Sequence, residues 1–507
     1  MTDSYEYFSG NLPSEPKPEL GKVLVTGATG YIGGRLVAEL LHRGYDLRIL
    51  VRAVSEENEE RYPNTEIIAG DALDKESLVP ALEGIHTAYY LIHSFLLDSD
   101  EFETADEIAA RNFSEVASEQ NVQKIIYLSG LGNFKSDLSA HLKSRIDVAR
   151  IFLECEVPTT ILRAAVIIGS GSASYEIIKH LVEKVPIMLM PLWSRTRCQP
   201  ISVRDVIKYL VGFLEIDTSH NRMFDIGGTD ILTYGQMLHV QALITGKKLR
   251  MLHIPLNLKR FYAYCVSLLT PVPGPITRCL MGSVMNEVIC QEDDIKKLIP
   301  FETLSYQQSL EKALRIEAKD TVLTRWSDAY PPAFELARKL SEMNRVPEYA
   351  SEYFLVSKQK KADLFKTICT IGGKEGWFYY NWMWRLRGYI DRIFLGVGSM
   401  RGRKNKDRLM VNDVVDFWRV EKIKQNKYLL LRAEMKLPGK AWLRFTIIDK
   451  SEECVVFVKA YFYVSNIWGR LYWLTFLPFH YFIFKSLLKQ IDLRSVNPTS
   501  ATTVSTA

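Results

Sequence analysis

The first 165 residues alternate short apolar runs with amphipathic segments, and this alternation constrains the fold more than any other feature of the sequence. The apolar runs predict strands at residues 22–26, 46–52, 65–69, 87–92, 124–129 and 159–168. Apolar residues at helical spacing predict helices between them, at residues 32–41, 75–82, 103–119 and 139–154. Repeated strand–helix units of this size are typical of an α/β, doubly wound parallel sheet.

The regular alternation ends near residue 170. Residues 170–320 contain frequent prolines with helices between them, which predicts a small substrate lobe rather than a further sheet. The periodicity breaks again near residue 345, and four β-rich runs follow at residues 414–423, 427–435, 441–449 and 453–464. Short polar turns separate these runs, as in antiparallel hairpins. A long aromatic helix is expected over residues 469–491.

These patterns predict two domains in a chain of 507 residues. The first occupies residues 21–345 and the second, of α+β class, residues 346–492. Residues 1–20 are polar, with three prolines and no apolar core, so they are expected to be a disordered lead-in and not a signal peptide. Residues 493–507 are expected to be a disordered tail.

Composition excludes several classes of protein. The 64 Lys and Arg residues against 59 Asp and Glu leave a charge of +5, too weak to indicate a nucleic-acid partner. Seven cysteines without CxxC spacing predict free thiols in a reducing, cytoplasmic compartment and no metal site. The apolar run at residues 471–484 is shorter than the roughly 20 residues of a spanning helix. We interpret it as a buried helix, with peripheral membrane contact as the alternative; the basic loop at residues 401–408 is a second candidate for anionic lipid.

The sequence TGATGYIG, residues 26–33, joins the first predicted strand to the first predicted helix. Gly27 permits a tight turn, Gly30 lets the backbone approach a diphosphate, and Gly33 lets the helix pack close to the strand. The free N–H groups of the helix start then favour bound phosphate. This context predicts a dinucleotide site that includes Gly27, Thr29, Gly30, Tyr31, Ile32 and Gly33.

Two later strand ends extend the predicted dinucleotide site. Arg52 stands where an acidic residue would bind the ribose 2′-hydroxyl, and its charge suits a 2′-phosphate, so NADP is favoured over NAD. Asp71 and Ala72 follow the third strand, where a side chain can meet the adenine. A turn-forming role for Asp71 is the alternative.

Several motifs resemble those of extended and atypical short-chain dehydrogenases/reductases, in particular NmrA-like and epimerase-like proteins. Over about residues 20–320 these are the glycine turn, the Gly70-Asp71 step, PISVRDV at 200–206 and FDIGG at 224–228; YYLIHS at 89–94, LSGLG at 128–132 and HLKSR at 141–145 match a bacterial-type subgroup. DFWRVE at 416–421 and PGKAWLRF at 438–445 are similar to that subgroup's uncharacterised C-terminal domain. The resemblance implies a Rossmann domain that binds NAD(P), followed by a helix-grip fold like that of START and polyketide-cyclase proteins.

The resemblance also implies a Ser, Tyr and Lys triad, which the sequence carries only in part. Ser129 fits the serine position, but the helix that should carry Tyr-x-x-x-Lys carries His141-x-x-x-Arg145. Histidine exchanges a proton near neutral pH, whereas arginine is a poor proton donor. Tyr127 lacks a lysine four residues on, and Tyr175, which is followed by Lys179, lies outside this predicted helix. His93, after a buried strand, is a further candidate ligand contact.

Two hypotheses follow. In the first, the protein is an NADP(H)-dependent oxidoreductase or epimerase of an apolar or lipid-like small molecule, with His141 or His93 as the substitute acid and Ser129 and Arg145 beside it. In the second, NADPH binds without turnover, and the protein is a scaffold or redox sensor, as the resemblance to NmrA-type regulators and to the reductase-like subunit of respiratory complex I allows. In either case the second domain would bind an apolar ligand.

Overall fold

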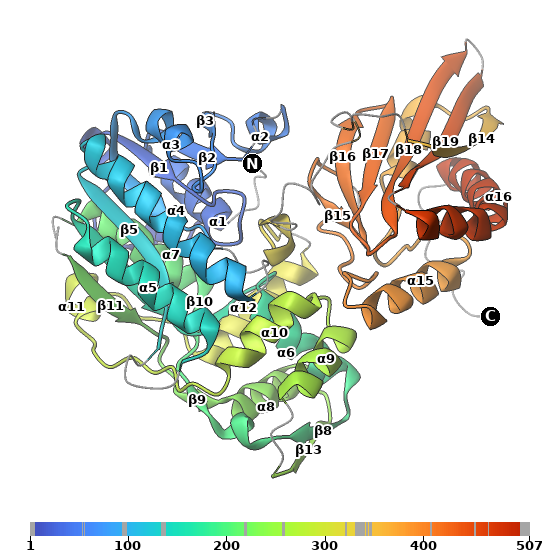
Figure 1. Ribbon diagram of the computed structural model, residues 1–507. Helices are drawn as coiled ribbons and strands as arrows, with labels where there is room; N and C mark the ends of the chain where they lie inside the picture. Colours follow the sequence, from blue (N-terminus) through green and yellow to red (C-terminus); the bar gives the residue numbers. More distant parts are fainter. Residues whose placement is uncertain are drawn as a thin grey trace. The chain divides into compact units, whose positions relative to one another are not determined.

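The computed structural model divides the chain into two compact units, Met1–Pro332 and Ala333–Ala507. It describes residues 6–52, 54, 56–93, 99–132, 138–216, 221–255, 259–319, 322–329, 340, 343, 347–405, 408–450, 453–464 and 466–496. The domain boundary expected near residue 345 lies outside the described residues. Figure 1 shows a sheet with helices in each unit.

A seven-stranded parallel sheet forms the centre of the first unit, in the order β11-β6-β5-β4-β1-β2-β3. Its strands are β1 (Lys22–Val25), β2 (Leu47–Val51), β3 (Glu66–Ala69), β4 (Ile85–Tyr90), β5 (Lys124–Gly130), β6 (Thr159–Ala164) and β11 (Arg222–Ile226). The reversal of strand order falls between β1 and β4. Ligands of such sheets bind outside the carboxyl ends of the strands at this point.

Helices cover both faces of this sheet (Figure 1). Leu36 and Leu40 of α1 (Gly33–His42) share a buried cluster with Val206 and Leu210 of α7 (Val203–Glu215). The helices α3 (Lys75–Leu82), α4 (Ser99–Glu119) and α5 (Ala140–Glu154) bury their apolar residues in a second cluster. The predicted α/β fold class is confirmed and the six predicted strands are present, because strands buried on both faces carry continuous apolar runs. The sixth strand is shorter than predicted, since it ends at Ala164 and Ile167–Ile168 pair outside this sheet.

The seventh strand, β11 (Arg222–Ile226), was not predicted, because it lies within residues 170–320, where the lobe is expected. This strand has only five residues, RMFDI, two of them charged. Asp225 lies at the end of the strand and pairs with Arg163 of β6, with 2.5 Å between the guanidinium and the carboxylate. The ion pair allows charged residues in a buried strand, which hides the strand from a search for apolar runs.

The rest of the first unit forms the lobe. Its longer helices are α6 (Ala173–Lys184), α8 (Tyr234–Ile244), α9 (Lys259–Leu269), α10 (Gly274–Ser283) and α12 (Tyr306–Ala318). Three strand pairs lie among them: β7 (Ile167–Ile168) with β10 (Ile201–Ser202), β8 (Ile187–Met190) with β13 (Arg250–His253), and β9 (Arg197–Cys198) with β12 (Leu232–Thr233). The short helices α2 (Glu56–Arg61) and α11 (Ile295–Leu298) complete the unit.

The expectation of a disordered lead-in over residues 1–20 is wrong for its described part. Phe8 is 4% exposed and belongs to the core cluster under α1. The buried carboxylate of Glu39 accepts the N–H groups of Phe8 at 2.7 Å and Ser9 at 3.1 Å, and the Ser9 hydroxyl at 2.7 Å. A single aromatic residue and one distant carboxylate fix this segment, and neither produces a periodic pattern.

The second unit contains a six-stranded antiparallel sheet in the order β14-β19-β18-β17-β16-β15. Its elements are β14 (Tyr349–Ser357), α14 (Lys361–Ile368), α15 (Asn381–Ile393), β15 (Val414–Val415), β16 (Trp418–Lys424), β17 (Tyr428–Ala433), β18 (Gly439–Lys450), β19 (Glu453–Val464) and α16 (Ile467–Val496). The predicted hairpins are confirmed, but β14 was not foreseen. The similarity to START-type helix-grip folds stays a prediction.

The final helix differs from expectation in length and burial. Helix α16 continues to Val496, so the tail expected from residue 493 begins as helix, and residues 497–507 lie outside the described part. Its second half is anchored by buried Phe484, Leu487 and Ile491, whereas Trp468 in its first half is 68% exposed. The interpretation of residues 471–484 as a buried helix is therefore wrong for much of that run, because the sheet covers only one side of it.

The lead-in supports a test of stability. We expect Glu39→Ala to lower the free energy of unfolding by about 2–3 kcal/mol, because three hydrogen bonds to a buried carboxylate are lost. Urea denaturation of the full chain measures this change. The exposed Glu83→Ala variant is the control and should stay within about 0.5 kcal/mol of the parent. Equal stability of the two variants would mean that the lead-in is not anchored through Glu39.

Candidate functional site

The glycine turn between β1 and α1 has no room for a side chain at Gly27 or Gly33. Gly27 has φ +64°, and a Cβ atom there would lie 2.6 Å from the carbonyl oxygen of Leu91. A Cβ atom at Gly33 would lie 2.2 Å from the carbonyl oxygen of Gly27, and one at Gly30 would lie 3.1 Å from the same atom. The backbone geometry therefore requires glycine at positions 27 and 33, whereas the diphosphate contact expected at Gly30 stays a prediction.

The start of α1 is open to an anion. Ile32 is the N-cap residue, and its side chain makes no capping hydrogen bond. Thr29, Gly30, Tyr31 and Ile32 all remain partly exposed. The N–H groups of a helix start carry partial positive charge, so this turn fits the diphosphate of a dinucleotide.

A buried arginine in α1 connects the glycine turn to distant parts of the chain. Arg35 is 3% exposed, and its guanidinium donates to the carbonyls of Thr324 at 3.1 Å and Ser170 at 2.9 Å. It also lies over the Tyr31 ring, 4.2 Å from the centroid. The Thr324 hydroxyl donates to the Tyr31 carbonyl at 2.7 Å. These contacts fix the turn from distant parts of the chain, so no local motif signals them.

Arg52 and Asp71 lie at the ends of neighbouring strands. Val51 of β2 and Ala69 of β3 are paired, and the Gly70 N–H donates to the Val51 carbonyl at 2.9 Å. Partial burial lowers the pKa of Arg52, and the charge of Asp71 opposes that shift. Asp71 also accepts the Leu73 N–H at 3.0 Å, as a turn-forming aspartate does. Ala72 is buried behind this turn.

The predicted catalytic residues lie together at the carboxyl ends of β4 and β5, but two are held by backbone. The Ser129 hydroxyl donates to the Arg145 carbonyl at 3.2 Å. The Arg145 guanidinium, in a side chain that is almost fully buried, donates to the carbonyls of Leu128 at 2.6 Å and Ile92 at 3.4 Å. Arg145 therefore fastens α5 to the ends of β4 and β5.

His141 stacks on His93, with ring centroids 5.0 Å apart and an interplanar angle of 25°. Asp106 of α4, whose side chain is 3% exposed, lies 3.7 Å from His93 Nδ1 and accepts the Ser144 hydroxyl at 2.9 Å. We call His93, His141 and Asp106 the histidine cluster. Sequence reasoning missed Asp106, since it lies in a long amphipathic helix that contains several other acidic residues.

The cluster is electrostatically unusual. Burial and the nearby Arg145 charge lower the pKa of His93 to about 4, against the opposing effect of Asp106. Burial, with His93 and Arg145, also lowers the pKa of His141 well below its usual value. Both rings are thus mainly neutral at pH 7. Buried titratable groups with shifted pKa values are concentrated at functional sites.

The histidine cluster begins just beyond the strand end that contacts the glycine turn. Leu91, whose carbonyl would contact a Cβ at Gly27, is two residues before His93. Its N–H donates to the Thr26 hydroxyl at 3.0 Å, and Thr26 in turn bonds the carbonyl of Tyr89. The glycine turn and the cluster therefore share the end of β4, at the reversal point of the sheet.

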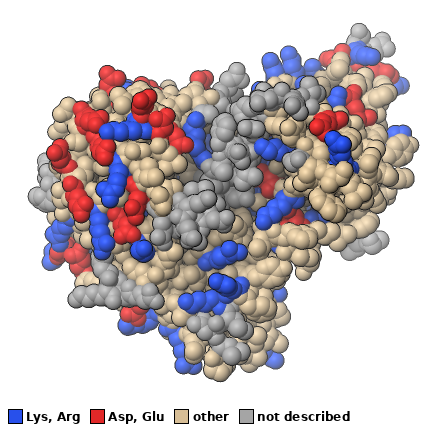
Figure 2. All heavy atoms as spheres, in the orientation of Figure 1, with Lys and Arg blue, Asp and Glu red and all other residues tan. Residues whose placement is uncertain are grey.

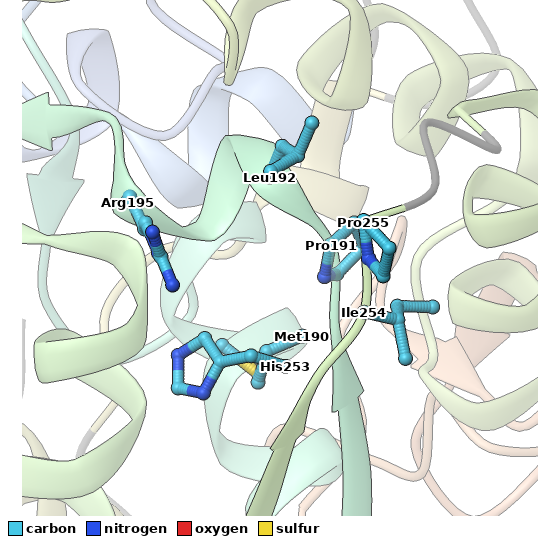
Figure 3. Close-up of a pocket in the computed structure, with 7 residues that line it drawn as sticks. All are labelled: Met190, Pro191, Leu192, Arg195, His253, Ile254 and Pro255. Carbon is cyan, nitrogen blue, oxygen red and sulfur yellow. The ribbon is translucent and has the colours of Figure 1, made fainter.

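The lobe contains a separate pocket of about 270 Å³. Met190, Pro191, Leu192, Ile254 and Pro255 make its wall apolar, with Arg195 and His253 as the polar members. Figure 3 shows the polar ends of Arg195 and His253 on one side of the pocket and the two prolines on the other. Met190 belongs to the same buried cluster as Leu131 and Leu142, which follow β5 and begin α5. The lobe is thus packed directly on the elements that carry the histidine cluster.

Comparison with known families agrees with this geometry. The NmrA-like family model matches residues 19–283, just over half of the chain, and the chain belongs to this family of NAD(P)-binding, reductase-like proteins. Residues 345–487 match a family described as a protein of unknown function, DUF2867. The predicted resemblance is confirmed for the first domain, and the second matches an uncharacterised family.

Individual relatives are distant. The photosystem II assembly factor Ycf39 of Trieres chinensis is 24% identical over 46% of this chain and 73% of its own length. The mitochondrial NADH dehydrogenase [ubiquinone] 1 alpha subcomplex subunit 9 of Arabidopsis thaliana is 25% identical over 43% of this chain and 56% of its own. Triphenylmethane reductase of Citrobacter sp., solved with NADP(H), aligns over 57% of this chain and 99% of its own, with 18% identity and a TM-score of 0.48.

The turn can be tested by charge. Gly30→Asp should weaken NADPH binding by at least about 100-fold, or about 2.7 kcal/mol, because a carboxylate would repel the diphosphate and fill its space. Fluorescence titration with NADPH measures the change. Gly10→Asp is the control, since a Cβ atom there meets nothing within 4 Å. Equal affinity of both variants and the parent would reject the turn as the phosphate site.

Proposed function

We propose that the protein is an oxidoreductase that uses NADP(H) and acts on an apolar carbonyl or hydroxyl compound. The observation that carries this proposal is the histidine cluster at the carboxyl end of β4, which adjoins the glycine turn. Burial of two imidazoles and a carboxylate costs free energy that an apolar cluster would not cost. A proton-exchanging role explains why such groups occur where ligands of this fold bind.

The chain offers separate contacts for each part of the dinucleotide. The glycine turn would hold the diphosphate, Arg52 the 2′-phosphate, and Asp71 with Ala72 the adenine. When bound, the nicotinamide supplies or accepts a hydride. The preference for NADP over NAD rests on Arg52 alone, since its positive charge suits a phosphate.

The histidine cluster would move the proton that accompanies hydride transfer. In reduction, protonated His141 or His93 would donate to the carbonyl oxygen as the alcohol forms; in oxidation, the neutral ring would accept the hydroxyl proton. Asp106 would stabilise the imidazolium, as a carboxylate does in other His–Asp pairs. Arg145 acts as a positioning residue, because it ties α5 and His141 to Ile92 and Leu128.

The lobe supports an apolar substrate. Five of the seven residues that line its pocket are apolar, and Arg195 and His253 would orient a single polar group.

A second candidate function is cofactor binding without turnover, in a scaffold or redox sensor. The hydrogen bonds of Ser129 and Arg145 to backbone carbonyls favour this second function. They engage Ser129 and Arg145 in holding the fold, so neither side chain is available for the role that the catalytic serine or lysine usually has. The names of two relatives, an assembly factor and a respiratory-complex subunit, are consistent with such a role. Consumption of NADPH with ketone, quinone and isoprenoid substrates supports the enzyme; tight binding without consumption supports the sensor.

Cofactor preference tests the role of Arg52. Arg52→Asp should move the ratio of NADPH to NADH affinity toward NADH by at least about tenfold, because the new carboxylate repels a 2′-phosphate and suits a 2′-hydroxyl. Paired titrations with both dinucleotides measure this ratio. Arg315→Asp, which makes the same charge change on the exposed face of α12, should leave it unchanged. An unmoved ratio in Arg52→Asp would exclude contact with the 2′-phosphate.

The pH profile tests the histidine cluster. Because the pKa of His93 is lowered to about 4 and that of His141 is also lowered, the protonated donor becomes scarcer as pH rises. The rate of NADPH oxidation by substrate should therefore rise as pH falls from 8 to 6, by up to about tenfold per unit. His141→Ala should lower kcat by at least about 100-fold with NADPH affinity preserved. The exposed Lys143→Ala variant of the same helix is the control; full turnover by His141→Ala would eliminate this donor.

A further inference from the structure

The second unit exposes a large apolar surface on two neighbouring helices. Trp382, Leu386 and Tyr389 follow one side of α15, at helical spacing, and Trp468, Leu471 and Phe482 follow one side of α16. These six side chains are between 51% and 68% exposed. We call them the α15/α16 surface. Single exposed apolar residues are ordinary, but a contiguous stripe of large ones indicates an interaction site.

The two helices are in direct contact. The Arg387 guanidinium of α15 lies over the rings of Tyr472 and Phe476 in α16, 5.1 and 5.5 Å from their centroids. In Figure 2, the face of the second unit over α16 is largely tan, without a band of acidic residues across it. The exposed apolar residues of α15 and those of α16 therefore lie on two helices that pack against each other.

The charges on this layer all have the same sign. The exposed charged residues of α15 and of α16 up to residue 491 are Arg385, Arg470, Lys485 and Lys489. Asp391 is the single acidic residue within those limits, and it is 6% exposed because it accepts the N–H groups of Gly398 at 2.8 Å and Lys436 at 2.7 Å. The surface thus combines aromatic and aliphatic side chains with unopposed positive charge.

We propose that the α15/α16 surface docks on the interface of an anionic lipid bilayer. Tryptophan and tyrosine prefer the boundary between headgroups and acyl chains, and arginine and lysine are attracted to anionic headgroups. The two helices would lie on the membrane surface, since no helix in the described part of the chain is long and apolar enough to cross a membrane. Pro478 lies within the exposed half of α16 and leaves its Leu474 carbonyl free to bond water or headgroups.

The same charges argue against a second copy of the chain as the occupant. A two-fold interface is self-complementary, so it would bring Arg385 and Arg470 toward the same cations of the other copy. Repulsion of like charges in a desolvated interface is unfavourable. An anionic bilayer neutralises these cations instead.

Two arginines of the basic loop at residues 401–408 make contacts within the second unit. The Arg401 guanidinium pairs with the buried carboxylate of Glu434 at 2.6 Å. The Arg403 guanidinium donates to the carbonyls of Ile371 at 2.6 Å and Asn405 at 2.7 Å. Both arginines are thus engaged within the unit, and the lipid contact suggested for the rest of the loop stays a prediction.

Flotation of the full chain with vesicles tests the proposal. The protein should float with vesicles of phosphatidylcholine and 30% phosphatidylglycerol, and at least tenfold less with phosphatidylcholine alone or at 0.5 M NaCl. Replacement of Trp382, Leu386, Trp468 and Leu471 by serine should reduce binding by at least about tenfold. Serine at Phe354 and Val356, which are 64% and 50% exposed on β14, is the control and should leave binding unchanged.

The charge component has its own variants. Arg385→Glu with Arg470→Glu should lower binding to the anionic vesicles by at least about tenfold, whereas Lys422→Glu with Lys424→Glu, on exposed positions of β16, should have a smaller effect. Equal losses in both pairs would overturn a specific role of the two helices.

Amide hydrogen exchange of the unaltered protein, with and without vesicles, tests the same surface without relying on the folding of a variant. Added anionic vesicles should protect peptides from residues 381–394 and 467–482, and those of β14 should not change. Absence of flotation, or protection that needs no vesicles and rises with protein concentration, would overturn the proposal in favour of no partner or of self-association.

Discussion

The close approach of the first glycine turn to the end of β4 is the constraint on which the rest of the first unit depends. A Cβ atom at Gly27 would meet the Leu91 carbonyl at 2.6 Å, so the turn and the strand end must lie in direct backbone contact. This contact leaves the start of α1 open to a diphosphate and puts His93, two residues beyond Leu91, on the same edge of the sheet. The glycine turn and His93 thus share one strand end, at the point where ligands of this fold bind, and the proposed phosphate binding and proton exchange would both take place there.

The polar groups beyond that strand end divide into two kinds. Arg145 and Ser129 bond backbone atoms and hold α5 against β4 and β5, which is a structural task. His93, His141 and Asp106 face one another instead, with lowered histidine pKa values that follow mainly from burial. Family membership establishes a nucleotide-binding domain, and α5 carries His141 and Arg145 where a tyrosine and a lysine are usual, so the proposed chemistry rests on the histidine cluster.

Elements with a repeated pattern could be predicted from the sequence, and elements fixed by single distant contacts could not. Six parallel strands, four antiparallel runs and the glycine turn each produce a local pattern of apolar or small residues. β11 was missed because an Arg163–Asp225 pair replaces apolar character, and the lead-in was misjudged because Phe8 and Glu39 act alone. The site could also be predicted only in part. The motif HLKSR indicated His141 and Arg145, but the position of Asp106 and the hydrogen bonds of Arg145 depend on tertiary contacts that no local motif indicates. Burial of α16 was overestimated because an apolar composition cannot distinguish a core from an exposed apolar surface.

We propose that the first domain holds a dinucleotide at the glycine turn, with the histidine cluster beside the reactive end of the dinucleotide. Titration of the purified chain with NADPH, followed by the chemical shifts of histidine ring protons, tests both parts at once. We expect saturable binding of NADPH and a shift of the His93 and His141 signals, and we expect both to be lost in Gly30→Asp. Absence of binding at millimolar NADPH, or binding that leaves both histidine signals unmoved, would contradict it.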